Sequence, residues 1–589
     1  MKSFSANVKW ILLPTFLLLS LVAASPVCAE LPKNISIQGL SGEALANVSE
    51  ALRTTSGLFS GEKVNPLWLN RYLRLAPERI AQALEPFGYY SSLVEINTDR
   101  TSSPPTIQII IDPGEPVHIS TRHLDIVGTR HDALLKQLDL FPLELGSILM
   151  HLRYEQAKAE LQAFAVDLGF LDARFTRHQI LVDRENNSAH LELVLDTGPQ
   201  FLFGEISIVG GEDYPQRFLR RYLSARRGEI FSHADLGKTQ QQFLDSDRFS
   251  TAVAIQLREE QQENNQIPVE IRLQAKARKR LRPGIGYGTD TGARAFLRYQ
   301  DVNLWHLGHN FTTDLLVAER QQNLIGSYLM PSYRNIDTML ALRGGYYAEN
   351  LDVYDTSYLF AEAEQIYGFN KGRVGSFYVR LQTESSTISG EEITTGTLMP
   401  GLRFRMGKLD EPLRPKRGYH LSLEVRGTRE ELFSEISLLQ ALGNVNWIYP
   451  LPWRTYLRVR GNAATTMQKN DFDEMPASLR FFTGGDRSVR GYAYQSLGPT
   501  NAVGEVVGGK HLLVGSIEFE KRFLKNWGTA IFYDAGNSFD ILADYELAEA
   551  AGLGLRYFTP IGPVRVDLAR TINADRNRYR LHIGLGVGW

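Results

Sequence analysis

The chain has 589 residues and a formal net charge of −2, so its overall charge does not favour electrostatic binding of nucleic acid. Glycine (50), phenylalanine (29) and tyrosine (25) are abundant, and the length allows several domains. Cys28 is the only cysteine, which excludes intrachain disulfides and multi-cysteine metal sites.

The first 29 residues have the pattern of an export signal. Lys2 and Lys9 form a basic start, residues 10–24 are apolar, and Val27-Cys28-Ala29 is a small-residue cleavage site. A retained membrane anchor and a lipoprotein attached through Cys28 are the alternatives. The apolar run is short for a membrane span, and residues 25–27 lack the approach that a lipoprotein site needs. We therefore expect a signal peptide over residues 1–29 and an exported bacterial protein whose mature chain has no cysteine.

From residue 34 to about 275, a strand–helix–helix–strand–strand pattern occurs three times. The three opening strands each end in glycine, at residues 35–39, 124–128 and 206–210. The second helices of the first two units end at Gly88 and Gly169, which suits a left-handed helix end, and the third has a polar turn instead. The closing strands are predicted at residues 93–96 and 106–112, 180–182 and 189–196, and 252–257 and 267–275. We expect three small domains over residues 30–115, 116–198 and 199–277.

From about residue 280, helical periodicity gives way to alternating segments of about ten residues, which is typical of outer-membrane barrels. In the last segment, Tyr579, Leu581 and Ile583 alternate with Arg580 and His582. Such alternation suits a wall with lipid on one side and a wet lumen on the other. We expect about sixteen strands over residues 278–589. The predicted fold class is α+β repeats followed by an all-β, 16-stranded antiparallel transmembrane barrel.

The stretch FFTGGDRSVRGY, residues 481–492, lies in the longest polar interval between predicted strands, from about Gln468 to Lys510. Counting short turns at residues 449–453, 523–527 and 559–563 as periplasmic places this interval after strand eleven, on the outer side. The glycines of the stretch let the backbone turn tightly, and Arg490 offers a planar guanidinium with five hydrogen-bond donors. Its candidate functional residues are Gly484, Gly485, Asp486, Arg487, Val489, Arg490, Gly491 and Tyr492. We expect the loop to fold into the lumen.

This stretch resembles the inward-folded loop of the BamA/TamA superfamily of outer-membrane protein assembly factors, and the three small units resemble POTRA (polypeptide-transport-associated) domains. Glu518 and Asp534 match positions where that superfamily carries loop-anchoring acids. The resemblance implies that Arg490 pairs with Asp534 with Glu518 nearby. An ordinary lumen salt bridge is the alternative. Asp567 and Arg570 are interpreted as further lumen charges.

A second candidate site is the seam where the first barrel strand meets the last. Glycine lowers strand stability and permits kinks, and it is dense in both strands. The candidate seam residues are Leu281, Gly284, Gly286, Gly288, Gly584, Gly586, Gly588 and the terminal Trp589. Such a seam could open sideways and template a client strand. The alternative is that these glycines only face a crowded lumen.

Three POTRA-like units and a barrel are most similar to the TamA branch of the superfamily. That resemblance implies insertion and assembly of outer-membrane proteins, notably autotransporters, in the bacterial outer membrane with the N-terminal domains in the periplasm. It also implies unfolded outer-membrane protein clients and an inner-membrane-anchored, TamB-like partner docking on those domains, and suggests no cofactor. An open sheet edge in a small domain could add a partner strand, but the sequence does not choose the edge.

Enzyme motifs are missing. The Gly284-x-Gly286-x-Gly288 run has no helix after it, so it is no nucleotide fingerprint, and neither a P-loop lysine nor a His-Glu-x-x-His motif occurs. We therefore predict a protein that is not an enzyme. Two rival functions remain open: a polypeptide-secreting or solute pore of the two-partner secretion type, and an outer-membrane anchor for a lipid-transfer partner.

Overall fold

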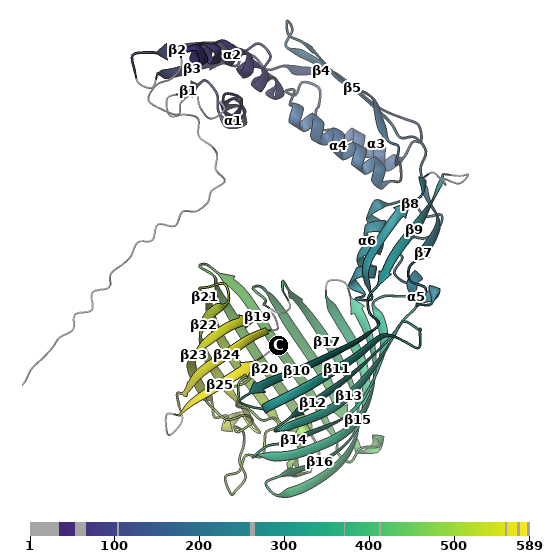
Figure 1. Cartoon of the computed structure of the whole chain (residues 1–589), viewed down its shortest axis with the longest axis vertical. Coiled ribbons are helices and arrows are strands. Elements are labelled where there is room, and N and C mark those ends of the chain that lie inside the picture. Colours follow the sequence, from purple (N-terminus) through teal and green to yellow (C-terminus); the bar gives the residue numbers. More distant parts are fainter. Residues whose placement is uncertain are drawn as a thin grey trace, which may run out of the picture. The chain divides into compact units, whose positions relative to one another are not determined.

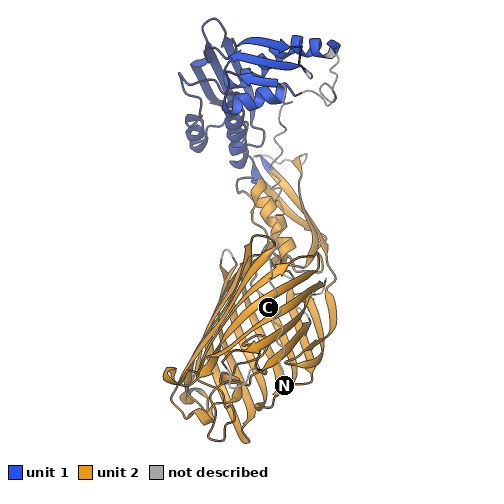
Figure 2. Ribbon diagram, turned by 90° about the vertical axis from the view of Figure 1, so that its left-hand side faces the viewer, with its two compact units in different colours: residues 1–202, 230–232, 263–266 blue, residues 203–229, 233–262, 267–589 orange. Residues whose placement is uncertain are grey.

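The computed structural model describes residues 35–53, 66–102, 105–258, 265–369, 372–411, 414–559, 562–573 and 578–585. The predicted signal peptide therefore lies outside the described residues. The chain forms two compact units, drawn in different colours in Figure 2. Residues 1–202, 230–232 and 263–266 form unit 1, and the rest of the chain forms unit 2. Among the described residues, no helix is long and apolar enough to cross a membrane.

Each of the three small domains contains one three-stranded sheet whose middle strand is the last in sequence, in the orders β1-β3-β2, β4-β6-β5 and β7-β9-β8. The first contains β1 (Ile35–Gln38), α1 (Gly42–Ala51), α2 (Pro66–Leu84), the short 3-10 helix η1 (Glu85–Phe87), β2 (Leu93–Asp99) and β3 (Thr106–Asp112). The second contains β4 (His118–Val127), α3 (Asp132–Asp139), α4 (His151–Asp167), β5 (Arg174–Asp183) and β6 (Ser188–Asp196). The third contains β7 (Leu202–Val209), α5 (Gln216–Arg220), α6 (His233–Asp245), β8 (Phe249–Gln256) and β9 (Gln266–Ala275).

The turns after the second helices follow the sequence pattern. Gly88 and Gly169 have φ of 87° and 88°, the left-handed conformation that glycine adopts without strain. The polar turn of the third domain places Asp247 in the same region, at φ 56°. In the first domain, Val48, Ile80 and Leu84 of the helices pack on Ile107 and Ile109 of the sheet, so the helices and the sheet share one core.

The C-terminal region is a closed barrel of sixteen antiparallel strands, β10 to β25, as the alternation predicted (Figure 1). The strands are β10 (Lys279–Gly288), β11 (Gly292–Leu304), β12 (His309–Ala318), β13 (Gln321–Pro331), β14 (Thr338–Asn350), β15 (Tyr354–Phe369), β16 (Arg373–Ile388), β17 (Glu391–Leu409), β18 (Gly418–Thr428), β19 (Leu438–Leu451), β20 (Thr455–Gln468), β21 (His511–Arg522), β22 (Trp527–Phe539), β23 (Ala548–Thr559), β24 (Gly562–Thr571) and β25 (Tyr579–Leu585).

The two faces of the barrel wall differ in chemistry. Leu513, Ile517 and Phe519 of β21 are exposed on the outer surface, whereas Ser516 and Glu520 at alternate positions are buried. On β24, Leu568 is exposed and Asp567 is buried. Arg570, which we expected in the lumen, lies instead on the outward side with Leu568, because it is an even number of residues away.

The third small domain packs against two turns of the barrel within unit 2. Arg221 donates to the carbonyl oxygens of Asn335 (3.1 Å) and Ile336 (2.9 Å) in the β13–β14 turn. Arg248 donates to the carbonyl oxygen of Gly308 (3.0 Å) in the β11–β12 turn. In an antiparallel barrel, successive connections lie at alternate ends, and the connection that carries residues 481–492 lies at the end opposite these two turns. The loop therefore enters the barrel from the end opposite the third domain, as its position after strand eleven predicted.

Candidate functional site: an arginine-anchored loop in the barrel

The connection between β20 and β21, residues 469–510, contains the FFTGGDRSVRGY stretch. Short bridges within the connection pair Phe481 with Gly509 and Thr483 with Leu497, so it folds on itself. Gly485 and Gly491 have φ of 100° and 111°, a region that other residues rarely adopt. A Cβ on Gly491 would lie 3.0 Å from the Cβ of Ala550, so the glycine lets the loop lie against the barrel wall.

Arg490 is the main attachment of the loop. Its Nε and Nη2 donate to the two carboxylate oxygens of Asp534 on β22, at 2.7 and 2.9 Å, and its backbone N–H donates to the same carboxylate at 3.1 Å. Its Nη1 donates to Glu518 on β21 at 2.8 Å and to Asp567 on β24 at 3.2 Å. One side chain thus joins the loop to three strands.

The Arg490 attachment is almost fully removed from solvent. Arg490 is 2% exposed and Asp534 is 0% exposed. The guanidinium carbon of Arg490 lies 3.3 Å from the centroid of the Phe532 ring, which adds a cation–π contact. Burial opposes the charge of Arg490, but the hydrogen bonds and charges of Asp534, Glu518 and Asp567 outweigh it and raise its pKa. The guanidinium is therefore a permanent charge in the loop.

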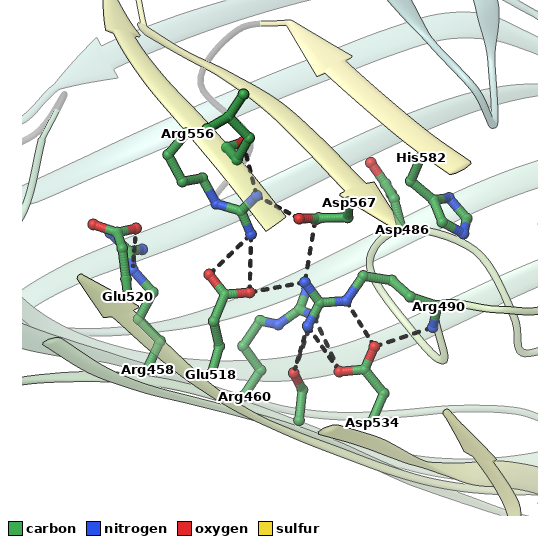
Figure 3. Close-up of polar contacts among 12 residues, drawn as sticks. Arg458, Arg460, Asp486, Arg490, Glu518, Glu520, Asp534, Arg556, Asp567 and His582 are labelled. Atoms are coloured by element: carbon green, nitrogen blue, oxygen red, sulfur yellow. Dashed lines mark hydrogen bonds and ion pairs between the residues drawn. The ribbon is translucent and has the colours of Figure 1, made fainter. Parts of the chain in front are cut away.

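Two further arginines complete this network (Figure 3). Arg556 on β23 donates to Glu518 at 3.1 Å and forms an ion pair with Asp567. Arg460 on β20 lies 4.0 Å from Asp534 and donates to Ser516 at 3.2 Å. The three arginines Arg460, Arg490 and Arg556 face the three carboxylates Glu518, Asp534 and Asp567, so the cluster is neutral as a whole. The structure thus brings Arg490, Asp534 and Glu518 together and adds Asp567, which we had not assigned to the loop.

The other predicted loop residues have different surroundings. Val489 is buried in a small apolar cluster with Val514 and Ala550, against which Tyr492 packs. Asp486 and Arg487 line a lumen cavity of about 450 Å³ that extends along β24 and β25 to Arg565 and Gly584. Gly484 has φ of 102° and lies against the carbonyl oxygen of Ala493. The tip of the loop is therefore held by packing on one side and faces a polar cavity on the other.

A second set of contacts holds the loop to the opposite wall. The backbone N–H of Ser478 donates to Glu384 on β16 at 3.0 Å. The Tyr354 hydroxyl at the start of β15 donates to the Gln495 side chain at 2.5 Å. The sequence analysis missed these residues, because polar side chains face the lumen on every strand and no local motif distinguishes Glu384 or Tyr354. The loop consequently spans the lumen from β15–β16 to β21–β24.

The seam between β10 and β25 is described at one residue pair, Gly288 with Gly584, and residues 586–589 lie outside the described residues. Beside it, Thr289 N–H donates to the Ile583 carbonyl oxygen (3.1 Å), the Ile583 N–H donates to the Thr289 hydroxyl (2.7 Å), and Arg294 donates to the Leu585 carbonyl oxygen (2.9 Å).

The remaining candidate seam residues are divided between one strand and the undescribed end. Leu281, Gly284 and Gly286 pair with β11 and not with β25 in the described region. The Phe296 ring covers Gly284 so closely that a Cβ there would lie 2.0 Å from it. Gly586, Gly588 and Trp589 lie outside the described residues. Residues 279–287 of β10 therefore pair with β11 alone among the residues that the structure describes.

Three family models match this chain. Residues 332–589 match the Omp85 superfamily domain, residues 34–113 match the POTRA domain described as TamA domain 1, and residues 201–276 match a POTRA model described as a surface antigen variable number repeat.

Curated relatives are similar over part of their length. The outer membrane protein assembly factor BamA of Nitratidesulfovibrio vulgaris is 21% identical over 63% of this chain and 49% of that protein. BamA of Buchnera aphidicola is 23% identical over 26% of this chain and 25% of that protein. The chain thus spans about half the length of the first relative and a quarter of the second.

The crystal structure of BamA from Haemophilus ducreyi lacking POTRA domains 1–3 superposes with a TM-score of 0.65 at 16% identity. The match covers 80% of this chain and 99% of that one, and it shows a shared fold.

Proposed function

This chain belongs to the Omp85 superfamily of outer-membrane proteins, with its POTRA domains in the periplasm, and we propose on that premise that it inserts and assembles β-barrel proteins, notably autotransporters, through the seam between β10 and β25. The coarser function, outer-membrane protein assembly or secretion, is that of the superfamily. Clients would be unfolded outer-membrane proteins. The proposal assigns the chain no catalytic step.

One observation carries the proposal, which is the contrast between the seam and the rest of the wall. Among the described residues, β10 and β25 share one residue pair, whereas β24 and β25 share seven and β15 and β16 share sixteen. Within the part of the barrel that the structure describes, residues 279–287 of β10 pair with β11 alone. A strand edge of this kind presents backbone donors and acceptors to an incoming strand.

The energetic consequence follows from the bonds at the seam. Four described hydrogen bonds involve the backbone of Thr289, Ile583 or Leu585. At roughly 0.5–1.5 kcal/mol each, they total about 2–6 kcal/mol. Such a closure can be exchanged for pairing with a client strand, because the exposed edge regains its bonds when the new strand adds.

The experiment locks the seam with a disulfide. The antiparallel register of Gly288 with Gly584 places Tyr287 opposite Leu585, one step along both strands. We expect a Tyr287→Cys/Leu585→Cys variant to lose client assembly when oxidised and to regain it on reduction, since opening would then require breaking a covalent bond. A Cys-free mature chain makes this pair the only thiols.

The matched control places a disulfide between strands that the proposal keeps together. Ile517 and Tyr533 are paired outward-facing residues of β21 and β22. An Ile517→Cys/Tyr533→Cys variant should assemble clients equally well in both redox states. Full activity with the β10–β25 seam oxidised would refute the proposed mechanism and move the function to the lumen or to the periplasmic domains.

We further propose that the chain acts with an inner-membrane-anchored, TamB-like partner that docks on the periplasmic domains. The match of residues 34–113 to the first POTRA domain of TamA supports this assignment. In the second domain, β4 is flanked on its free side by residues 146 and 147, since the Ile119 N–H donates to the Ser147 carbonyl oxygen (3.0 Å) and its carbonyl oxygen accepts from Gly146 (2.8 Å). That leaves β5 as the edge better suited to adding a partner strand.

A steady open pore, one of the rival functions, is less well supported by the loop. Contacts to β15–β16 and to β21–β24 hold residues 478–495 across the lumen. The same locked-seam experiment also tests the other rival function, lipid transfer by an anchored partner. Lipid transfer that continues when the seam is oxidised does not need the seam to open.

A further inference from the structure

The connection between β10 and β11 holds an aspartate that no motif singled out. Asp290 belongs to the first hairpin of the barrel yet is 6% exposed, because its carboxylate points at the loop. Its Oδ2 accepts the backbone N–H of Asp486 at 2.7 Å, across 196 residues of sequence. Gly485 has no side chain to obstruct this contact, and a Cβ there would lie 2.6 Å from the same oxygen.

The last strand completes this junction. His582 on β25 is 2% exposed, and its Nδ1 lies 3.7 Å from Asp290 Oδ1. Its Nε2 accepts the backbone N–H of Gly491 at 3.4 Å. Figure 3 shows His582 and Asp486 beside the Arg490 network. Three parts of the barrel thus meet at one point: the first hairpin, the last strand and the loop.

Two attachments of the loop, at Arg490 and at Asp486, lie on opposite sides of the seam. Arg490 binds Asp534, Glu518 and Asp567 on the side of the last strands, and Asp486, four residues earlier, binds Asp290 on the side of the first. Four residues, with the Ser488 N–H bonded to the Gly485 carbonyl oxygen at 3.2 Å, leave little slack between them. We propose that the loop staples the seam from the lumen, and that Asp290 is the positioning residue whose release from Asp486 lets the seam open.

The two attachments differ in strength, which identifies the one that releases. Arg490 makes five hydrogen bonds to three carboxylates. Asp290 accepts one backbone N–H, and its Oδ1 and His582 Nδ1 have no hydrogen-bond partner among the described residues. Asp486 also brings a second acidic group beside Asp290, and the two like charges repel each other when both carboxyls are ionised. The staple therefore parts at Asp290 and stays fixed at Arg490.

This inference rests on the proposed role of the seam, and its test uses no client. Spin labels on Leu297 of β11 and Leu581 of β25, both exposed on the outer surface, report the seam width in the full-length protein in nanodiscs. We expect Asp290→Ala to raise the ratio of open to closed barrels by about tenfold, the effect of one hydrogen bond to a charged acceptor. Asp290→Asn keeps an oxygen acceptor for the Asp486 N–H but loses the charge, so it should raise the ratio by only about threefold, less than Asp290→Ala does.

Glu319 provides the matched control. It lies in the connection between β12 and β13, and its carboxylate accepts the backbone N–H of Ala293 on β11 at 3.0 Å. Within the described residues, it has no hydrogen bond to the loop. Glu319→Ala should leave the ratio unchanged. If Asp290→Ala does not fold, Gly485→Ala tests the same contact, because its Cβ displaces the Asp290 carboxylate and should also open the seam.

Three results would overturn the inference: an Asp290→Ala seam as closed as that of Glu319→Ala, a closed Gly485→Ala seam, or an Asp290→Asn seam as open as Asp290→Ala. None depends on client assembly. A failure of the locked-seam experiment would thus refute the proposed function while leaving the staple intact.

Discussion

Replacing Asp534 with asparagine tests whether Arg490 holds the loop. The native carboxylate accepts three hydrogen bonds from Arg490, two of them from the guanidinium, with no exposure to solvent. Asparagine retains one oxygen and presents an NH₂ group to a donor. The loss is at least one charged hydrogen bond, about 1.5–3 kcal/mol, together with an unsatisfied donor pair costing about 1–3 kcal/mol.

Glu518 and Asp567 still bind Nη1 of Arg490 in this variant, so we place the total near the low end, at about 3 kcal/mol. A change of that size raises the opening equilibrium of the loop about 100-fold. Amide hydrogen exchange over residues 484–492 measures it directly, since exchange from a locally open state reports the free energy of that opening.

Glu424 supplies the comparison for this experiment. It accepts a hydrogen bond from Arg403 at 3.2 Å in the lumen wall and from Tyr378, away from residues 484–492. Glu424→Gln should leave exchange of the loop at the native rate. If Asp534→Asn also left it there, the reasoning that a buried arginine fixes the loop would be wrong.

Two further predictions concern single positions. Gly491→Ala should open the loop about tenfold more often, since strain at φ 111° and a Cβ 3.0 Å from the Cβ of Ala550 cost about 1–3 kcal/mol. Gly504 has φ of 91° and lies in open space, so Gly504→Ala should leave residues 484–492 unaffected in the same exchange measurement. His151 of α4 lies 2.6 Å from the Tyr90 hydroxyl between the first two domains, and burial lowers its pKa. Because the folded state disfavours the protonated imidazole, stability at this contact is complete above about pH 6.5 and is lost as the pH falls through the lowered pKa. Amide exchange of α4 should therefore accelerate on acidification in the native protein and not in His151→Gln.

Periodicity was sufficient to predict the architecture. Alternation of period two with short turns gave sixteen strands, and parity placed residues 481–492 at the outer end, as the structure has them. The alternation of residues along a strand also explains the error at Arg570. Arg570 is two residues from Leu568 and shares its outward face, so the prediction that it faces the lumen was wrong. The opening strand of the second domain is longer than expected, His118–Val127 in place of residues 124–128, because its first half pairs in parallel with β6 despite weak alternation.

The candidate site was predictable where a motif carried it. Arg490, Asp534 and Glu518 followed from the resemblance, and the structure places them in contact. Asp290 and His582 did not, since each is one polar residue in an ordinary turn or strand. Their meeting with the loop depends on how the barrel closes, which joins residues 196 and 91 positions apart. The sequence around each residue has no pattern that indicates such a contact.

The strong loop attachment and the few described contacts of the seam are best understood together. A barrel that closed mainly through a long β10–β25 ladder would have to break many backbone bonds before a client strand could enter. Among the described residues, the closing contacts are divided between a few bonds at Gly288–Gly584 and Thr289–Ile583 and the loop in the lumen. The Arg490 cluster is neutral only when all three arginines and all three carboxylates are present, so partial release leaves a buried charge uncompensated. In the proposed mechanism, the loop therefore stays bound to β21–β24 while the seam opens, and it is in place to close the barrel again when the client leaves.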